Sequence, residues 1–150
     1  QGHHRAGSGG GNTTIDDVIS EIDIFGGDEL IDYNFCEDLP ASLSGKVYAD
    51  TDGDCVQDAG ELPLAGVRVE LLDRSGNVIE FRLTDSQGRY RFENLRPDRY
   101  SVREIQPTGF FQGGQVAPAG RADTSVADLL QNIDLLSGES LTALDFCERP

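Results

Sequence analysis

The stretch RYRFENLRPDRYSVREI, residues 89–105, decides the fold of this chain. In its first part, Tyr90 and Phe92 alternate with polar side chains, which is the two-residue period of a half-buried β-strand. The sequence RPDR then supplies the chemistry of a turn. A second alternating run follows, with Tyr100, Val102 and Ile105 as its apolar candidates. The stretch therefore predicts two successive strands joined by a short turn.

The same alternation continues on both sides of this stretch, with turns such as RSGN and SQGR between the runs. The segment SVADLLQNI could instead form one or two turns of helix, but its β-rich neighbours favour a strand. We expect a loop over the Gly-, Pro- and Ala-rich residues 107–123. The pattern predicts an all-β fold, an antiparallel two-sheet β-sandwich of about seven strands. The expected strands are residues 43–50, 65–73, 77–85, 89–95, 99–105, 125–136 and 140–146.

The two ends of the chain resemble each other, which indicates an internal repeat. Cys36 aligns with Cys147 at a shift of 111 residues, and 13 of the 39 aligned pairs are identical without a gap. We expect residues 1–39, here called the tail unit, to be the C-terminal strands of a preceding repeat. Residues 40–150, here called the bead, are expected to be a complete β-sandwich repeat. A period of this length is domain-sized and indicates a tandem array of separate domains.

The acidic stretch DTDGDCVQDAGE, residues 50–61, has the ligand spacing of an EF-hand-type calcium loop. Calcium binds about six to eight oxygens without strong angular demands, so carboxylates on alternate residues can turn toward one point. The clustered anions would repel each other without a cation between them, and calcium is therefore the expected folding partner of the loop. The expected Ca²⁺ ligands are Asp50, Asp52, Asp54, the backbone carbonyl of Val56, Asp58 and Glu61.

One position departs from this template. The sixth residue of such a loop is usually glycine because φ is positive there, and here it is Cys55. The alternatives are a loop that wraps differently and a solvated acidic loop without metal. Magnesium fits less well, since it takes few protein ligands and keeps several waters. Two recurring pairs, Asp17/Asp128 and Asp23/Asp134, either add a second set of calcium ligands or form a solvated face.

Composition argues against several classes of function. The net charge of −15 would repel nucleic acid, and no basic patch is present to neutralise phosphates. No apolar run is long enough to insert into a membrane. The N-terminal sequence QGHHRAGSGGG is polar, so we expect the chain to begin after any targeting segment or within a longer protein. The bead contains no histidine and no pair of carboxylates that stands out, so we expect no enzyme.

Two longer segments resemble a known family. They are SGKVYADTDGDCVQDAGELPLAGVRVELLD, residues 44–73, and TDSQGRYRFENLRPDRYSVREIQPTGF, residues 84–110. Together they look like the SdrD B-like repeat domain, a relative of Cna-B domains, whose motif is an Asp-rich loop ending in Gly-Glu, then Leu-x-Gly-Val and T-D-x-x-G-x-Y-x-F-x-x-L-x-P-G-x-Y. Asp98 stands near the place of the turn glycine of that motif. The resemblance covers roughly residues 42–147, and residues 1–36 resemble the end of another copy.

The resemblance implies a prealbumin-like, Ig-like β-sandwich and a place in the stalks of secreted or surface proteins. It also implies calcium in the acidic loop, on Asp50, Asp52, Asp54, Asp58 and Glu61. In a sandwich of this kind, the first and last strands end at the same pole if they run parallel. We therefore expect a Cys55–Cys147 disulfide, with Cys36–Cys55 or free thiols as the alternatives. Either disulfide implies an oxidising, extracytoplasmic setting.

These observations lead to a functional hypothesis. We expect a calcium-stabilised structural repeat of an extracellular stalk, adhesin or filament protein, located outside the cell or at its surface. Its expected partners are neighbouring copies of the same repeat, arranged head to tail. The alternatives are a module whose pole loops bind a host protein or glycan, and an accessory domain of a secreted hydrolase.

Overall fold

The computed structural model describes residues 4–15 and 17–150 of the chain. These residues form two compact units, residues 1–39 and 40–150, which correspond to the tail unit and the bead. Within the described ranges, the chain has no helix that is long and apolar enough to cross a membrane.

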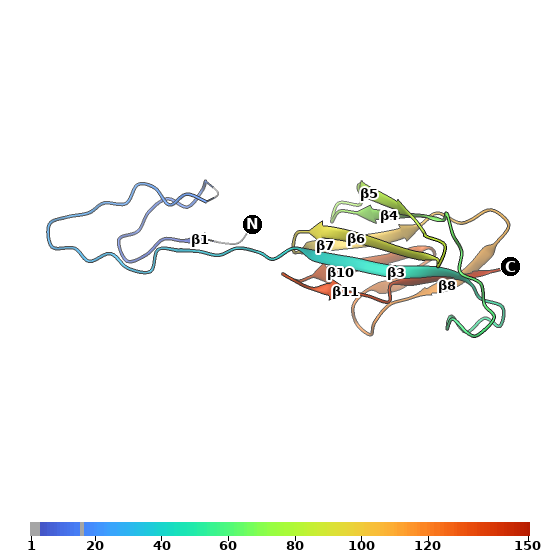
Figure 1. Ribbon diagram of the computed structural model, residues 1–150. Helices are drawn as coiled ribbons and strands as arrows, with labels where there is room; N and C mark the ends of the chain where they lie inside the picture. The colour runs from blue at the N-terminus through green and yellow to red at the C-terminus, as the bar shows by residue number, and fades with distance from the viewer. Residues whose placement is uncertain (1–3, 16) are drawn as a thin grey trace. The chain divides into compact units, whose positions relative to one another are not determined.

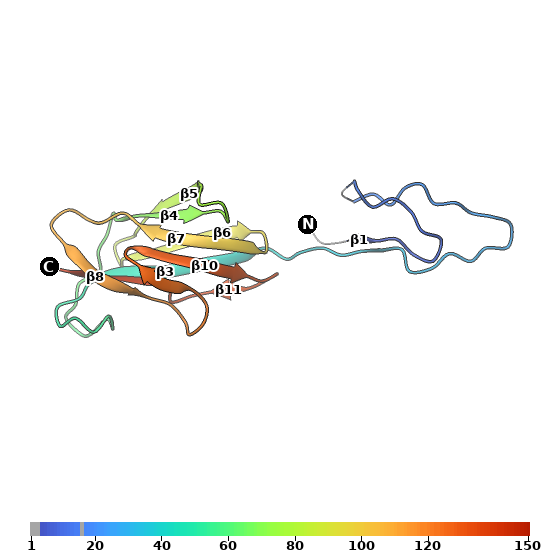
Figure 2. The ribbon, with the colours of Figure 1, turned by 180° about the vertical axis from the view of Figure 1, so that it is seen from behind.

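The bead is a sandwich of two β-sheets (Figures 1 and 2). In the first sheet the strand order is β5-β4-β7-β10-β9, and every neighbouring pair is antiparallel. Figure 2 shows β7 and β10 side by side at the middle of this sheet. The strands are β4 (Arg68–Leu72), β5 (Val78–Leu83), β7 (Asp98–Glu104), β9 (Asp123–Val126) and β10 (Leu129–Leu135).

The second sheet is built around its longest strand, β3, which has neighbours on both edges. On one edge, β6 pairs with β3 in the antiparallel sense. On the other edge, β11 and then β12 pair with β3 in the parallel sense, and β8 pairs antiparallel with β12. The strands are β3 (Ala41–Ala49), β6 (Arg89–Leu95), β8 (Phe111–Val116), β11 (Ser140–Leu141) and β12 (Asp145–Arg149).

The core lies between the two sheets and consists of the inward-facing residues of the alternating runs. Phe92 from β6 and Phe146 from β12 are completely buried against residues such as Val69 and Ile133 of the other sheet. Tyr90 is also buried, and its hydroxyl donates a hydrogen bond to the carbonyl of Leu144. The buried phenol therefore keeps a partner for its one polar atom.

The prediction of an all-β two-sheet sandwich is confirmed, but several details of the strand assignment were wrong. Residues 107–123 contain β8 and the start of β9 instead of a continuous loop, and the expected last strand is divided into β11 and β12. Ile105 was expected to face the core but is 41% exposed. The alternation that begins with Tyr100 and Val102 continues with Glu104, which is the buried residue. The sheets are also not wholly antiparallel, because β3 has parallel partners.

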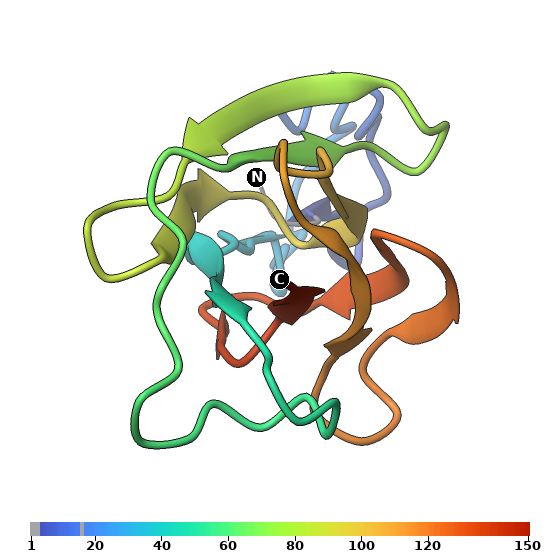
Figure 3. The same cartoon turned by 90° about the vertical axis from the view of Figure 1, so that its right-hand side faces the viewer.

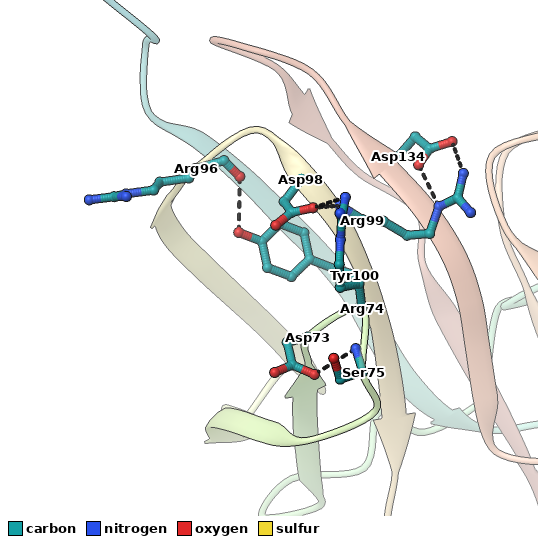
Figure 4. A network of polar contacts seen from close by, with 8 residues as sticks. All are labelled: Asp73, Arg74, Ser75, Arg96, Asp98, Arg99, Tyr100 and Asp134. Carbon is teal, nitrogen blue, oxygen red and sulfur yellow. Dashed lines mark hydrogen bonds and ion pairs between the residues drawn. The ribbon is translucent and has the colours of Figure 1, made fainter. Parts of the chain in front are cut away.

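At the pole of the bead where β3 begins, surface ion pairs join the strand ends (Figure 4). Arg99 binds Asp134 through two nitrogens, at 2.7 and 3.0 Å. Asp98 lies within β7 and pairs with Arg74 at 2.6 Å. Asp134 is thus engaged with a guanidinium and is not part of a calcium ligand set with Asp128. Exposed pairs of this kind contribute about 0–1 kcal/mol each.

The tail unit has little regular structure. Its strands β1 (His4–Arg5) and β2 (Asn34–Phe35) pair antiparallel, with His4 opposite Phe35 and Arg5 opposite Asn34. Several of its apolar side chains are exposed, among them Ile24 at 70% and Phe35 at 52%. The described part of the tail unit contains no second sheet against which these side chains could be buried.

The core packing predicts a large difference between two phenylalanines. Replacing Phe92, which is completely buried, with alanine is expected to lower the free energy of unfolding by about 3–5 kcal/mol, because a cavity remains between the sheets. The matched control is Phe111→Ala at a side chain that is 75% exposed, with an expected change within about 0.5 kcal/mol. Urea unfolding followed by tyrosine fluorescence measures both, and equal losses would contradict this description of the core.

Candidate metal centre

The candidate site lies at the pole of the bead where β3 ends and β12 approaches the C-terminus (Figure 3). Because these strands run parallel, with Glu148 opposite Ala49, the residues that follow β3 lie beside the end of β12. The N–H of Asp50 donates to the carbonyl of Glu148 at 2.7 Å. The acidic loop therefore starts from a fixed point on the sheet, and Figures 1 and 3 show it projecting from this end in cyan to green.

A disulfide joins the middle of the loop to β12. The structure pairs Cys55 with Cys147, whose Cα atoms are 5.6 Å apart, and leaves Cys36 as an exposed free thiol. This is the pairing that the sequence analysis favoured over Cys36–Cys55. Gly114 on β8 leaves room for it, since a Cβ at that position would lie 2.9 Å from the sulfur of Cys55. Glycine at this position is thus a steric requirement of the disulfide.

Three of the expected ligands converge in the loop. One carboxylate oxygen each from Asp50, Asp52 and Asp54 lies within 4.8 Å of the other two. Asp50 is 2% exposed, whereas Asp52 and Asp54 are exposed, so the cluster opens to solvent on one side. Burial and the neighbouring charge of Asp54 raise the pKa of Asp52 above its ordinary value. The contribution of Asp54 to this shift, which is smaller than that of desolvation, is the electrostatic repulsion that the spacing of the carboxylates predicts.

Backbone donors shape the loop around its first carboxylate. The N–H groups of Gly53 and Cys55 donate to the two oxygens of Asp50, at 2.7 and 3.0 Å. Burial favours a higher pKa for Asp50, but these N–H donors outweigh it, and the pKa is held below its ordinary value. The carboxylate of Asp50 is therefore ionised at neutral pH.

Glu61 closes the loop from its far end. Its Oε1 accepts hydrogen bonds from the N–H of Thr51 at 2.7 Å, and its Oε2 accepts from the N–H of Asp58 at 3.1 Å. These N–H donors lower the pKa of Glu61. Of the other two expected ligands, Val56 donates its N–H to Asp54, and Asp58 contributes the backbone contact to Glu61. The structure thus gathers three carboxylates into one cluster and holds Glu61 across the mouth of the loop.

Cys55 adopts the left-handed conformation that glycine usually supplies at the sixth position, with φ at +55°. For a residue with a Cβ this conformation costs about 1–2 kcal/mol. Here the hydrogen bond from its N–H to Asp50 and the bond from its sulfur to Cys147 both hold the residue in place. The loop therefore keeps the expected turn without glycine.

The residues of the loop fit a calcium ion. Two oxygens on opposite sides of calcium are roughly 4.6–5.2 Å apart, since each Ca–O distance is about 2.3–2.6 Å. The 4.8 Å limit on the oxygens of Asp50, Asp52 and Asp54 meets this requirement. All the available donors are hard oxygens, which suit calcium better than a metal that prefers nitrogen or sulfur.

A second acidic cluster, which the sequence analysis did not identify, lies at the same pole. One oxygen each from Glu104, Asp128 and Glu148 falls within 4.8 Å of the other two. Burial and the nearby Glu148 raise the pKa of Glu104 to about 9. Two signals in the sequence pointed to it: Glu104 occupies an inward position of an alternating strand, and Glu148 recurs as Glu37 in the repeated motif FCE.

Comparison with known protein families identifies the family to which this chain belongs. The model of the SdrD B-like domain matches residues 41–147. The chain belongs to the SdrD B-like domain family. The resemblance of the two sequence motifs to that family is thereby confirmed.

The curated relatives of this SdrD B-like domain are much longer than the chain. Serine-aspartate repeat-containing protein F of Staphylococcus epidermidis is 35% identical over 126 residues, which cover 83% of this chain and 8% of that protein. A fibrinogen-binding protein of Staphylococcus epidermidis is 37% identical over 92 residues, covering 61% of this chain and 8% of that protein. The minor pilin GBS52 of Streptococcus agalactiae has a TM-score of 0.47 and 18% identity, covering 75% of this chain and 46% of the pilin.

The homology also bears on location and chemistry. The relatives are cell-surface serine-aspartate repeat proteins of staphylococci, and the matched family is a repeat domain that is not an enzyme. The chain is thus a repeat domain of the B type found in surface adhesins. The expectations of a cell-surface location and of no enzymatic activity agree with this homology.

The disulfide predicts a measurable loss of stability on its removal. It closes a loop across 92 residues, and a loop of that length restricts the unfolded chain by roughly 4–5 kcal/mol. Cys147→Ser is expected to lower the free energy of unfolding by about that amount, and Cys36→Ser to leave it unchanged because Cys36 is free and exposed. Urea denaturation of both variants, with thiol titration of the unfolded proteins, measures the effect. A larger loss for Cys36→Ser would favour the alternative pairing.

Proposed function

We propose that the bead is a calcium-stabilised structural repeat that acts as a rigid spacer in an extracellular stalk, adhesin or filament protein. The observation that carries this proposal is the convergence of Asp50, Asp52 and Asp54 at the end of a disulfide-closed loop. When bound, calcium would supply positive charge between these carboxylates. The proposed ligands are Asp50, Asp52, Asp54, the carbonyl of Val56, Asp58 and Glu61.

The residues of the chain itself prepare the loop for the ion. The N–H groups of Gly53 and Cys55 orient the carboxylate of Asp50, and Thr51 orients Glu61. The disulfide and the bond from Asp50 to Glu148 fix the loop to β12. A cation bound between these groups would stiffen the whole pole, because the loop is attached to the sheet at both its first residue and its middle.

We also propose that the tail unit is the C-terminal part of a preceding repeat, and the structure supports this in two ways. The pairs His4/Phe35 and Arg5/Asn34 of β1 and β2 have the same register as Gln115/Phe146 and Val116/Asp145 of β8 and β12, 111 residues later. Left-handed backbone positions recur at the same shift, namely Asp17 and Asp128, Glu21 and Asn132, and Asp32 and Ala143.

Burial supports the same assignment. Ile24, which is 70% exposed, corresponds to Leu135, which is 2% exposed. Phe35, which is 52% exposed, corresponds to Phe146, which is completely buried. The tail unit thus carries the apolar pattern of strands β8 to β12 without the strands that cover them in the bead. Neighbouring copies of the repeat are accordingly the proposed partners, in head-to-tail order.

A binding module is the alternative that one observation favours. A cleft of about 630 Å³ lies over β3 and β6, and its lining includes Lys46, Arg82, Arg89 and Arg91. One relative is a fibrinogen-binding protein by name, although the chain spans 8% of it. Asp85 and Asp145 also line the cleft, and Arg82 and Arg91 pair with Glu80 and Glu93. The four cations still outnumber the two carboxylates of the lining, which suits an acidic segment of a partner protein. This cleft lies on the face of the sandwich, whereas the sequence analysis placed a binding surface on the pole loops.

Calcium is expected to raise the thermal stability of the chain. At a free calcium concentration 100 times Kd, binding stabilises the folded state by about 2.7 kcal/mol, which raises Tm by roughly 10 °C for a domain of this size. Isothermal titration with CaCl₂ and melting curves in CaCl₂ and in EDTA measure the two quantities. Asp52→Asn is expected to lose most of the effect, and the control Glu93→Gln on the surface of β6 to retain it.

An absence of calcium binding at millimolar concentration, together with equal Tm values in CaCl₂ and EDTA, would rule out the calcium-stabilised spacer. Limited proteolysis gives an independent readout, because EDTA is expected to increase cleavage between Asp50 and Glu61.

The repeat assignment predicts opposite results for two equivalent phenylalanines. Phe146→Ala is expected to lower the free energy of unfolding of the bead by about 3–5 kcal/mol, because the side chain is completely buried. Phe35→Ala, at the matching position of the tail unit, is expected to leave the unfolding of the bead unchanged. Urea unfolding of both variants measures this, and a loss for Phe35→Ala would show that the tail unit belongs to the core of the bead.

A further inference from the structure

We propose that the free edge of β5 is a docking surface at which two copies of this chain pair side by side. The two β5 strands would run antiparallel about a two-fold axis at Phe81. Among residues 40–150, all of which are described, β4 is the one strand that pairs with β5. Figures 1 and 2 show β5 at the rim of the bead, with β4 on one side of it. This contact is lateral, so it differs from the head-to-tail order proposed above.

The backbone of β5 presents unpaired polar groups at this edge. In an antiparallel sheet, successive residues of an edge strand direct their N–H and C=O groups alternately toward the neighbouring strand and away from it. The N–H of Thr84, the residue after β5, donates to the carbonyl of Val67 at 2.9 Å and so points toward the β4 side. The alternation turns the N–H and C=O groups of Leu83 and Phe81 to the free edge. Such a row of groups is a template for the addition of another strand.

Apolar side chains lie along the same edge. Phe81 and Leu83 lie opposite Glu70 and Arg68 on β4, so they project from the outer face of the sheet, away from the core. Ile79, Phe81 and Leu83 are 52%, 48% and 59% exposed. The guanidinium of Arg68 lies 3.9 Å from the centre of the Phe81 ring, which still leaves half of that side chain in solvent. Three exposed apolar side chains on an unpaired edge strand indicate a surface that takes a partner.

The charges of β5 select a second copy of the chain as that partner. Glu80 and Arg82 lie on the other face of the strand and pair with each other. When Phe81 lies opposite Phe81 of the second copy, each Glu80 lies directly opposite Arg82 of the other copy. A two-fold axis at Glu80 or at Arg82 would instead place like charges opposite each other, which is unfavourable. The strand is therefore self-complementary in one register, as a two-fold interface requires.

The length and charge of the edge set the strength of the contact. The ladder between β4 and β5 shifts register between Val78 and Glu80, so the regular part of β5 is short. One short strand from each copy makes a small interface of the weak, transient class. In a chain of net charge −15, Arg82 and Arg68 balance Glu80 locally, so two copies can approach at this edge. Along an array of repeats, as proposed above, such weak contacts would reinforce one another.

The experiment measures self-association of the full 150-residue chain by sedimentation velocity in EDTA, at about 0.15 M NaCl to screen the net charge. All proteins carry Cys36→Ser, so that the exposed free thiol cannot crosslink two chains. This parent protein is expected to shift from monomer toward dimer between about 10 µM and about 1 mM. Glu80→Arg and Arg82→Glu are each expected to raise the Kd of the dimer about tenfold, because both cross-strand charge pairs become repulsive.

A mixture of these two variants tests the register. In the heterodimer the substituted side chains face each other with opposite charge, so an equimolar mixture is expected to regain the association of the parent. Glu93→Arg is the matched control, since it reverses one charge of an equally exposed pair with Arg91 on β6. It is expected to associate like the parent. Association in neither variant being weakened, or its not returning in the mixture, overturns the pairing at Phe81.

A further variant covers the case in which a charge reversal does not fold. Phe81→Glu places two like charges at the two-fold axis, while Arg68 beside it supplies a partner within its own chain. It is expected to remain folded, as checked by urea unfolding, and to remain monomeric. A dimer of Phe81→Glu as strong as that of the parent, or no dimer of the parent at about 1 mM, overturns the proposal.

The calcium dependence separates this proposal from the calcium-stabilised spacer. The free edge of β5 shares no residue with the acidic loop, so equal association is expected in EDTA and in CaCl₂. A protein that binds no calcium and still forms the dimer supports the β5 contact and contradicts the spacer. A dimer that forms only in CaCl₂ overturns the β5 contact.

Discussion

The parallel contact between the first and last strands of the bead is the constraint on which the rest of the structure depends. β3 is covered on one edge by β11 and β12, so the beginning and the end of the repeat are neighbours in one sheet. This contact puts the residue after β3, Asp50, against the backbone of Glu148. The disulfide, the acidic loop and the buried glutamates all follow from that arrangement.

The same contact concentrates negative charge at one pole of a chain whose net charge is −15. The two acidic clusters are linked through the backbone hydrogen bond from Asp50 in the loop to Glu148 of the second cluster, and through the adjacent Cys55–Cys147 disulfide. Arg149 lies against Gly53 of the acidic loop, and the ammonium of Lys46 donates to Gln57 of the same loop. At the opposite pole, by contrast, carboxylates such as Asp134 meet arginines directly. The two ends of the bead thus balance charge in different ways.

Much of the architecture could be predicted from the sequence because two-residue alternation is a local signal. Tyr90, Phe92, Tyr100 and Val102 all point to the core as the alternation requires. Strand β8 was missed because Gly113 and Gly114 carry no side-chain pattern, and their role is steric room for Cys147. A sequence reading assigns such glycines to a loop.

The two candidate sites could be predicted to different degrees, because a sequence pattern reveals only those ligands that lie close together along the chain. The acidic loop has its ligands within twelve residues, so spacing alone indicates a cluster, and the structure brings Asp50, Asp52 and Asp54 together. The other cluster combines residues from positions 104, 128 and 148, and only the tertiary fold makes them neighbours. The recurring Asp128 was noticed in the sequence, but it was grouped with Asp134, which lies with Arg99 instead.

The disulfide has a consequence for a repeat that is pulled along its chain. Tension that enters before β3 and leaves after β12 acts on parallel neighbours in opposite directions, so their hydrogen bonds are loaded in shear and not one at a time. If those bonds yield, the Cys55–Cys147 link still keeps the intervening segment out of the path of the force. A segment with a sequence separation of 92 would extend by roughly 310 Å if it were released. The covalent link therefore sets a short limit on how far one repeat can lengthen under load.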